Sequence, residues 1–136
     1  MTAPVVLDAS AILAFLQGEP GQERVWDALH NRQCLVSAAN QAEVIAKALD
    51  RGTNQATIQA VLAELAYTVV DIKAEDGAQA GWMRDATRKL GLSLGDRLCL
   101  ALAQRLEAPV ITADRPWLDV ASLLGLNILC IRPEAH

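Results

Sequence analysis

The stretch VVLDASAIL, Val5 to Leu13, is apolar except for one aspartate and one serine. Its opening residues have the character of a short buried strand, and a helix is expected to start near Ala9. Burying an unpaired carboxylate costs on the order of several kcal/mol. Asp8 is therefore expected either to cap the helix that follows or to belong to a site at the end of the strand.

Four other short apolar runs are bounded by polar residues and also resemble strands. They are CLVS (34–37), YTVVDI (67–72), PVITAD (109–114) and LNILCI (126–131). Helical spacing lies between them: a helix over Thr53 to Leu65 with Thr53 as its N-cap, and one over Leu94 to Leu106, where leucine recurs every fourth residue. This alternation predicts a three-layer α/β/α sandwich around a central, mainly parallel five-stranded sheet.

The chain has 136 residues, which is most economically a single domain over residues 1–136 with an ordinary core. No apolar run reaches the roughly 18 residues that span a membrane, and the N-terminus lacks a signal-peptide pattern, so we expect a cytoplasmic protein.

Cys34, Cys99 and Cys130 sit among apolar neighbours and are expected to be core residues. The three tryptophans are expected in the core or at a dimer interface. The net charge of −4 argues against a protein that grips nucleic acid through a broad basic face.

Carboxylates follow the predicted strands and open the helices between them. Asp8 ends the first strand, and Asp114 follows the strand around Ile111. In open parallel sheets, ligands bind beyond the carboxyl ends of the strands, so both side chains should emerge at one edge. Glu43 and Asp96 lie on the helices that follow CLVS and precede VIT, respectively.

Each of these acids also has a purely structural interpretation. Asp8 and Asp114 are suitable helix caps, and Ser93 with Asp96 has the spacing of a capping box. Glu43 precedes Lys47 by four residues, which is the spacing of a solvated helix ion pair.

The four acids are more informative as a set. Two carboxylates at about 4 Å repel by about 4 kcal/mol in an effective dielectric of about 20, so a cluster needs a counter-charge or raised pKa values. The chain has only three lysines and no Gly-rich phosphate loop. A hard divalent cation fits best, because Mg²⁺ takes oxygen ligands and needs few direct carboxylates. Metal-assisted cleavage of a phosphodiester is the natural chemistry.

The motifs VVLDASAIL, AEV (42–44), SLGDRLCLALA (93–103) and VITADRPW (110–117) together resemble the PIN domain, and more closely its VapC-type toxin branch. The resemblance covers essentially the whole chain. It implies a Mg²⁺- or Mn²⁺-dependent endoribonuclease that acts as the toxin of a type II toxin-antitoxin pair, hydrolyses RNA phosphodiester bonds and inhibits translation and growth.

Matched position by position, the resemblance implies that the catalytic and metal-binding acids are Asp8, Glu43, Asp96 and Asp114. Asp8 and Asp96 are expected to bind the cation directly, and the other two directly or through water. Ser10 and Thr112 match hydroxyl positions that orient the acids, although local backbone bonding is an alternative for both. The sequence leaves open whether one or two ions bind, and Asp119 matches no firm ligand position.

The resemblance also implies partners: a VapB-type antitoxin whose C-terminal segment covers the acidic groove, an RNA substrate, and a second copy in a homodimer. Arg97 and Arg115 lie beside the acids and are the candidate RNA-binding residues. Arg84, Arg88 and Lys89 are weaker candidates whose alternative is an ordinary charged surface. We expect no membrane partner. The sequence does not identify the RNA.

The same residues do not fit two other classes of α/β protein. A receiver domain needs an adjacent acidic pair after its first strand and a late lysine, whereas Asp8 is followed by Ala9 and the C-terminus is CIRPEAH. A haloacid dehalogenase-type phosphatase needs Asp-x-Asp, whereas Ser10 stands at the third position. The alternative that stays open is a catalytically inactive PIN-like module that binds RNA or a partner.

Overall fold

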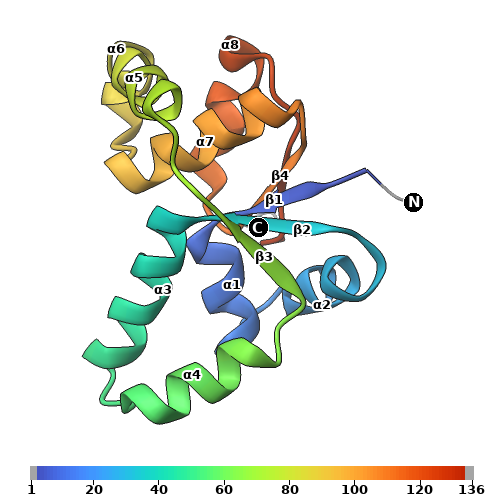
Figure 1. The fold of residues 1–136 in the computed structure, drawn as a ribbon. Helices are drawn as coiled ribbons and strands as arrows, with labels where there is room; N and C mark the ends of the chain where they lie inside the picture. The colour runs from blue at the N-terminus through green and yellow to red at the C-terminus, as the bar shows by residue number, and fades with distance from the viewer. Residues whose placement is uncertain (1–2, 134–136) are drawn as a thin grey trace.

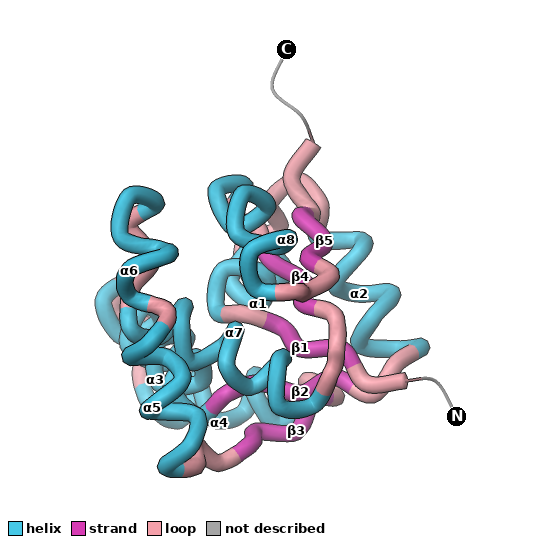
Figure 2. The backbone as a smooth tube through the Cα atoms, turned by 90° about the horizontal axis from the view of Figure 1, so that it is seen from above, coloured by secondary structure: helices cyan, strands magenta, loops and turns pink. Residues whose placement is uncertain are grey.

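The computed structural model describes residues 3–133, and their centre is a five-stranded sheet. The strands are β1 (Val5–Leu7), β2 (Cys34–Ser37), β3 (Tyr67–Val70), β4 (Val110–Thr112) and β5 (Ile128–Cys130). They lie side by side in the order β3-β2-β1-β4-β5, as Figure 2 shows from above, and every pair is parallel. The predicted five-stranded parallel sheet is confirmed, with β1 at its centre.

Helices cover both faces of the sheet and complete the predicted three layers (Figure 1). On one side lie α1 (Ala9–Leu16), α2 (Gln22–Asn31), α3 (Ala38–Asp50) and α4 (Gln55–Ala63). On the other lie α5 (Ala74–Trp82), α6 (Arg84–Thr87), η1 (Arg88–Leu90), α7 (Leu94–Leu106), η2 (Arg115–Val120) and α8 (Ala121–Leu124). In the described residues no helix is long and apolar enough to cross a membrane.

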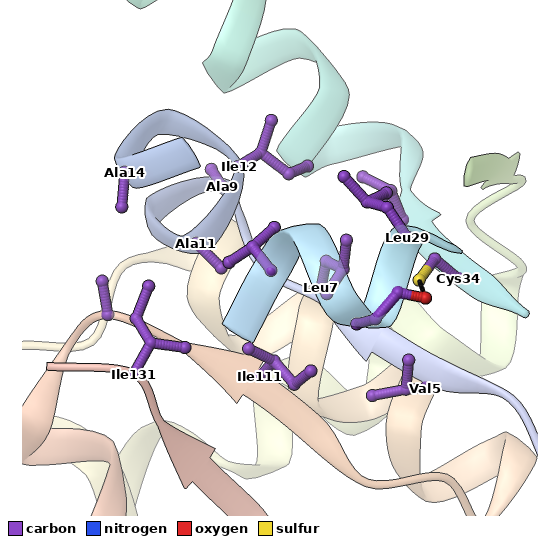
Figure 3. Packing of buried hydrophobic residues seen from close by; sticks show 14 of the residues in the cluster. Val5, Leu7, Ala9, Ala11, Ile12, Ala14, Leu29, Cys34, Ile111 and Ile131 are labelled. Atoms are coloured by element: carbon purple, nitrogen blue, oxygen red, sulfur yellow. Dashed lines mark hydrogen bonds between the residues drawn. The ribbon is translucent and has the colours of Figure 1, made fainter. Parts of the chain in front are cut away.

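The alternation along β1 explains the two halves of the core. Val5 and Leu7 point into the half beneath α1 and α2, together with Ile111 from β4 (Figure 3). Val6, between them, packs on the opposite side with Leu100 of α7. Because successive strand residues face opposite ways, three consecutive apolar residues serve both layers. All three valine and leucine side chains of β1 are fully buried.

Side chains cap the starts of α1, α3, α4 and α7. Asp8 caps α1 by accepting a hydrogen bond of 2.9 Å from the Ala11 backbone N–H. Helix α7 has the predicted bounds and the predicted capping box of Ser93 and Asp96. The prediction that Thr53 caps the next helix was wrong: α4 begins at Gln55, and the Asn54 side chain accepts from the Thr57 N–H at 2.9 Å.

The cysteines and tryptophans occupy different environments. Cys34 and Cys99 are buried, as predicted, and Cys34 donates a hydrogen bond of 3.2 Å to the Ala28 carbonyl (Figure 3), while Cys130 is only half-buried. Trp117 is fully buried. Trp26 and Trp82 are 51% and 80% exposed, so neither is a core residue.

Candidate functional site

Asp8 lies between β1 and α1 and is only 2% exposed. Its Oδ1 accepts the capping bond from Ala11, and its Oδ2 accepts a hydrogen bond of 2.8 Å from the Thr112 hydroxyl. The Ser10 hydroxyl lies 2.8 Å and 2.9 Å from the two carboxylate oxygens. Asp8 is therefore both a helix cap and the centre of a hydroxyl cluster.

The two hydroxyls connect Asp8 to the end of β4. The Ala113 N–H donates to Ser10 Oγ at 2.9 Å, and the Asp114 N–H donates to Thr112 Oγ1 at 3.0 Å. Because each hydroxyl accepts from the backbone, its own hydrogen is free to donate to the carboxylate. For Thr112, the local backbone bonding and the orientation of Asp8, which the sequence presented as alternatives, occur together. Ser10 contacts Asp8, and its backbone partner is not local but Ala113.

Burial raises the pKa of Asp8 from 3.8 to about 7. The hydrogen bonds from Ala11, Thr112 and Ser10 oppose this shift, and the nearby charge of Asp96 adds to it. The hydrogen-bond partners are all neutral, so no cation of the protein offsets the burial of this charge through a direct bond.

Glu43 lies on α3, which begins directly after β2. Its Oε1 accepts a hydrogen bond of 2.8 Å from the side-chain amide of Asn40, one turn earlier. Burial raises the pKa of Glu43; the bond from Asn40 lowers it, and the charge of Asp96 raises it further. Lys47 has a smaller, favourable effect, so the predicted pairing with Lys47 is not the main contact of this carboxylate.

Asp96 lies in the first turn of α7, where its Oδ2 accepts from the Ser93 N–H at 2.9 Å. Burial raises the pKa of Asp96, the hydrogen bonds with Ser93 lower it, and the charge of Asp114 raises it. Asp96 thus interacts electrostatically with Asp8, Glu43 and Asp114. Each of the other three predicted acids is therefore electrostatically coupled to Asp96.

Asp114 is half-buried at the start of η2. It occupies the N-cap position, but its side chain makes no capping hydrogen bond. The carboxylate is therefore not occupied by the capping role that the sequence allowed.

The charges of the four acids act on one another, but their side chains do not close on one point. Within residues 3–133, no three Asp, Glu, His or Cys side chains form a group that could hold a metal ion as they stand. The donor set still fits a hard divalent cation, because Mg²⁺ retains several waters and needs only one or two carboxylates directly. The hydrogen bonds of Asp8, Glu43 and Asp96 come from hydroxyl, amide and backbone groups, which leaves their charge to be neutralised by such an ion.

The two candidate RNA-binding arginines are placed differently. Arg97 is half-buried, and its Nη1 donates to the Ala80 carbonyl of α5 at 2.8 Å. Arg115 is half-buried and donates to the Arg132 carbonyl at 3.3 Å. Arg88, a weaker candidate, pairs with Asp85 on the exposed surface. Arg97 and Arg115 therefore both make bonds within the protein.

Asn40 and Gly95 contact the site and were not singled out from the sequence. Asn40 is 1% exposed, and its amide also donates to the Gly95 carbonyl at 3.3 Å. A side chain on Gly95 would collide with the Glu43 carboxylate. The only local signal was the three-residue spacing of Asn40 and Glu43, which puts both on one helix face.

Comparison with protein families finds one match: the PIN domain model fits residues 5–123. Among curated proteins, none matches the chain.

Solved structures with similar folds include three toxins or toxin-antitoxin complexes. A chain of a toxin-antitoxin complex from Klebsiella pneumoniae aligns with a TM-score of 0.72 and 20% identity, covering 98% of this chain and 100% of that one. A chain of VapBC-1 from nontypeable Haemophilus influenzae gives 0.70 and 22%, covering 94% and 98%. VapC20 of Mycobacterium tuberculosis, a toxin that cleaves the sarcin-ricin loop, gives 0.63 and 14%, covering 80% and 87%. At these identities the likeness concerns the fold.

Proposed function

Because the chain belongs to the PIN domain family, we propose that it is a Mg²⁺- or Mn²⁺-dependent endoribonuclease and the toxin of a toxin-antitoxin pair. The observation that supports this most is the electrostatic coupling of Asp8, Glu43 and Asp114 to Asp96, while none of the four carboxylates forms an ion pair with a basic side chain within residues 3–133. Mutual repulsion of this kind favours a divalent ion.

The four acids have different roles in this proposal. Asp8 and Asp96 bind the cation directly, and Glu43 and Asp114 bind it directly or through water. When bound, the cation neutralises charge on the scissile phosphate and makes water a stronger nucleophile. Ser10 and Thr112 hold Asp8 in place, since both hydroxyls lie within hydrogen-bond distance of its carboxylate. The product is RNA hydrolysed at a phosphodiester bond.

The proposed substrate is RNA, guided by a few basic side chains rather than by overall charge. The chain has a net charge of −4, so long-range attraction to a polyanion is weak. Arg115 is the proposed phosphate contact. Arg97 is proposed to act on the carboxylates of the site, since its charge lowers the pKa of Asp96. Its side chain is held by the hydrogen bond to α5.

The proposed protein partner is a VapB-type antitoxin. Several similar folds were solved as toxin-antitoxin complexes. The present chain has an apolar groove between α1, α3 and α4, lined mainly by Leu13, Leu16, Val44, Ile58, Val61 and Leu62. Leu16 and Val61 are 36% and 40% exposed there, which suits the apolar face of a partner helix.

RNA cleavage by the purified protein tests the enzymatic proposal. Protein freed of antitoxin should cleave total RNA with Mn²⁺ or Mg²⁺, and EDTA should abolish the cleavage. Asp96→Asn should lose it, because Asp8, Glu43 and Asp114 are each electrostatically coupled to Asp96. Asp50→Asn, at the exposed end of α3, is the matched control and should cleave normally.

RNA that stays intact under these conditions would contradict the nuclease proposal. Binding of RNA without cleavage would then favour the catalytically inactive module. End-mapping of cellular RNA after brief induction identifies the substrate if cleavage occurs.

Co-purification tests the partner. An antitoxin encoded beside this chain should form a complex that Val61→Asp weakens, whereas Thr68→Asp on the exposed part of β3 should not. Homodimerisation is a further proposal, and the mass in solution measured by light scattering tests it.

A further inference from the structure

We propose that Asn40 is a positioning residue for Glu43 and that Gly95 provides the space in which the Glu43 carboxylate is held. This inference rests on the proposed metal-dependent nuclease and assigns two residues to its site. It joins α3 to α7, two helices that are separated in sequence and meet beside the acids.

The hydrogen bonds of Asn40 define the orientation of its amide. Nδ2 donates to Glu43 Oε1 at 2.8 Å and to the Gly95 carbonyl at 3.3 Å. Both partners accept hydrogen bonds only, so a reversed amide would set oxygen against oxygen at both. The bond to the carboxylate is charge-assisted and is therefore the stronger of the two.

Asn40 is a costly residue for a purely structural role. Its side chain is 99% buried, and its Oδ1 has no hydrogen-bond partner within residues 3–133. A buried acceptor without a partner destabilises a fold, and an apolar residue of similar volume would avoid that cost. The amide makes two contacts that an apolar residue could not make, one with Glu43 and one with the backbone of α7.

Gly95 complements this contact from the other helix. A Cβ on Gly95 would lie 2.8 Å from the Glu43 Cδ and closer still to Oε1. Glycine is a weak helix former, and Gly95 lies in the first turn of α7. The small residue lets the carboxylate lie against the helix, where the charge of Asp96 also acts on it.

The two contacts hold one carboxylate oxygen and leave the other available. Oε1 accepts from Asn40, whereas no hydrogen bond from the described part of the chain reaches Oε2. A carboxylate fixed in this way loses less side-chain entropy when it binds a ligand. Asn40 and Gly95 therefore raise the affinity of the site for a cation without touching the cation.

The Gly95→Ala variant separates positioning from stability. The atom it would displace is the end of a flexible side chain, and alanine favours helix, so the urea midpoint should not fall. Mn²⁺ affinity, measured from the electron paramagnetic resonance signal of free Mn²⁺, should weaken about tenfold. Gly77→Ala in α5, where a Cβ meets nothing within 4 Å, is the matched control and should leave the affinity unchanged.

The Asn40→Leu variant tests the amide itself. It keeps the branching at Cγ and the number of heavy atoms, and it removes the orphaned oxygen together with the donor, so the chain should fold. Its Mn²⁺ affinity should fall about tenfold, as in Gly95→Ala. Thr87→Val is the control: Thr87 is fully buried and donates to the Met83 carbonyl at 2.9 Å, so its loss perturbs the fold but not the site.

The outcomes distinguish the two proposals. If the unchanged protein binds Mn²⁺ and both Gly95→Ala and Asn40→Leu bind it equally well, the positioning role is wrong and the metal site stands. If Thr87→Val weakens binding as much as Asn40→Leu does, the effect of Asn40 is structural and the positioning role is also wrong. If the unchanged protein binds no Mn²⁺, the proposed metal site fails and the positioning role fails with it.

Discussion

The Thr112 hydroxyl donates a hydrogen bond of 2.8 Å to Oδ2 of Asp8, 104 residues earlier in the chain. The same hydroxyl accepts from the Asp114 N–H, so one side chain connects the first acid of the site to the backbone of the last. The two strands that end here, β1 and β4, are neighbours in the sheet. The pairing of these strands therefore brings Asp8 next to Thr112 and the backbone of Asp114.

Replacing Thr112 with valine should destabilise the protein. The change keeps the β-branched shape, removes one of the hydrogen bonds to the Asp8 carboxylate and leaves the Asp114 N–H without its partner. A loss of about 2 kcal/mol in the free energy of unfolding is expected at neutral pH. Urea denaturation measures it, with Thr68→Val on the exposed surface of β3 as the control. Equal stability of the two variants would show that the bond contributes nothing.

The raised pKa of Asp8 should make stability depend on pH in the metal-free protein. The folded-state pKa of about 7 exceeds the ordinary value of 3.8, so the folded protein holds this proton more tightly. The resulting stabilisation is complete below about pH 4 and is lost as the pH rises through about 7, by up to about 4 kcal/mol. Asp8→Asn lacks this dependence.

Urea unfolding in EDTA at pH 4, 5.5 and 7 measures the effect of Asp8. The stability of the unchanged protein relative to Asp8→Asn should fall over this range. Parallel curves for the two proteins would mean that Asp8 titrates normally in the folded state.

Metal should reverse the destabilisation that Asp8 causes at neutral pH. Mn²⁺ at a hundredfold excess over its dissociation constant should add about 2.7 kcal/mol to the free energy of unfolding. Thermal unfolding with and without EDTA measures this gain. Asp8→Asn and Asp96→Asn should both abolish it, and an unchanged melting temperature in the parent protein would contradict the metal site.

Arg97 and Arg115 should behave differently when replaced. Arg97→Met removes the bond to the Ala80 carbonyl and should lower stability by about 1 kcal/mol. Arg115→Ala should instead weaken binding of a single-stranded RNA oligonucleotide and reduce the slope of log affinity against log salt by about 1. Fluorescence anisotropy in an Asp96→Asn background measures the binding without cleavage.

Asp76 should affect stability alone. Its carboxylate accepts from Arg105 at 2.8 Å and 3.0 Å and from the Lys73 N–H at 3.0 Å. Burial raises the pKa of Asp76, but the hydrogen bonds from Arg105 and the Lys73 N–H, together with the charges of Arg105 and Lys73, outweigh it and lower the pKa. Asp76→Asn should cost about 2 kcal/mol at pH 7, with the difference shrinking as the pH falls below about 4. Mn²⁺ affinity should be unchanged, and a weaker affinity would extend the site to α5.

The strands and the long helix were predictable because their signals are local. Apolar runs of three to six residues marked every strand, and the leucines of α7 fixed its bounds. The N-cap of α4 was predicted one residue too early. Thr53 and Asn54 are both good N-caps, and only the backbone conformation selects Asn54. The contact of Asn40 with Gly95 was missed because it joins two helices 55 residues apart.

The sequence by itself determined the order of the elements, the parallel sheet and the edge at which Asp8 and Asp114 emerge, because hydrophobic periodicity and strand direction follow from neighbouring residues. Only the tertiary structure decided the environment of each side chain. It buries Asp8 among hydroxyls, directs Arg97 to α5 and sets Glu43 between Asn40 and Gly95. These depend on how β1, β4, α3 and α7 pack together, and the desolvation and hydrogen bonds that tune a carboxylate arise from that packing.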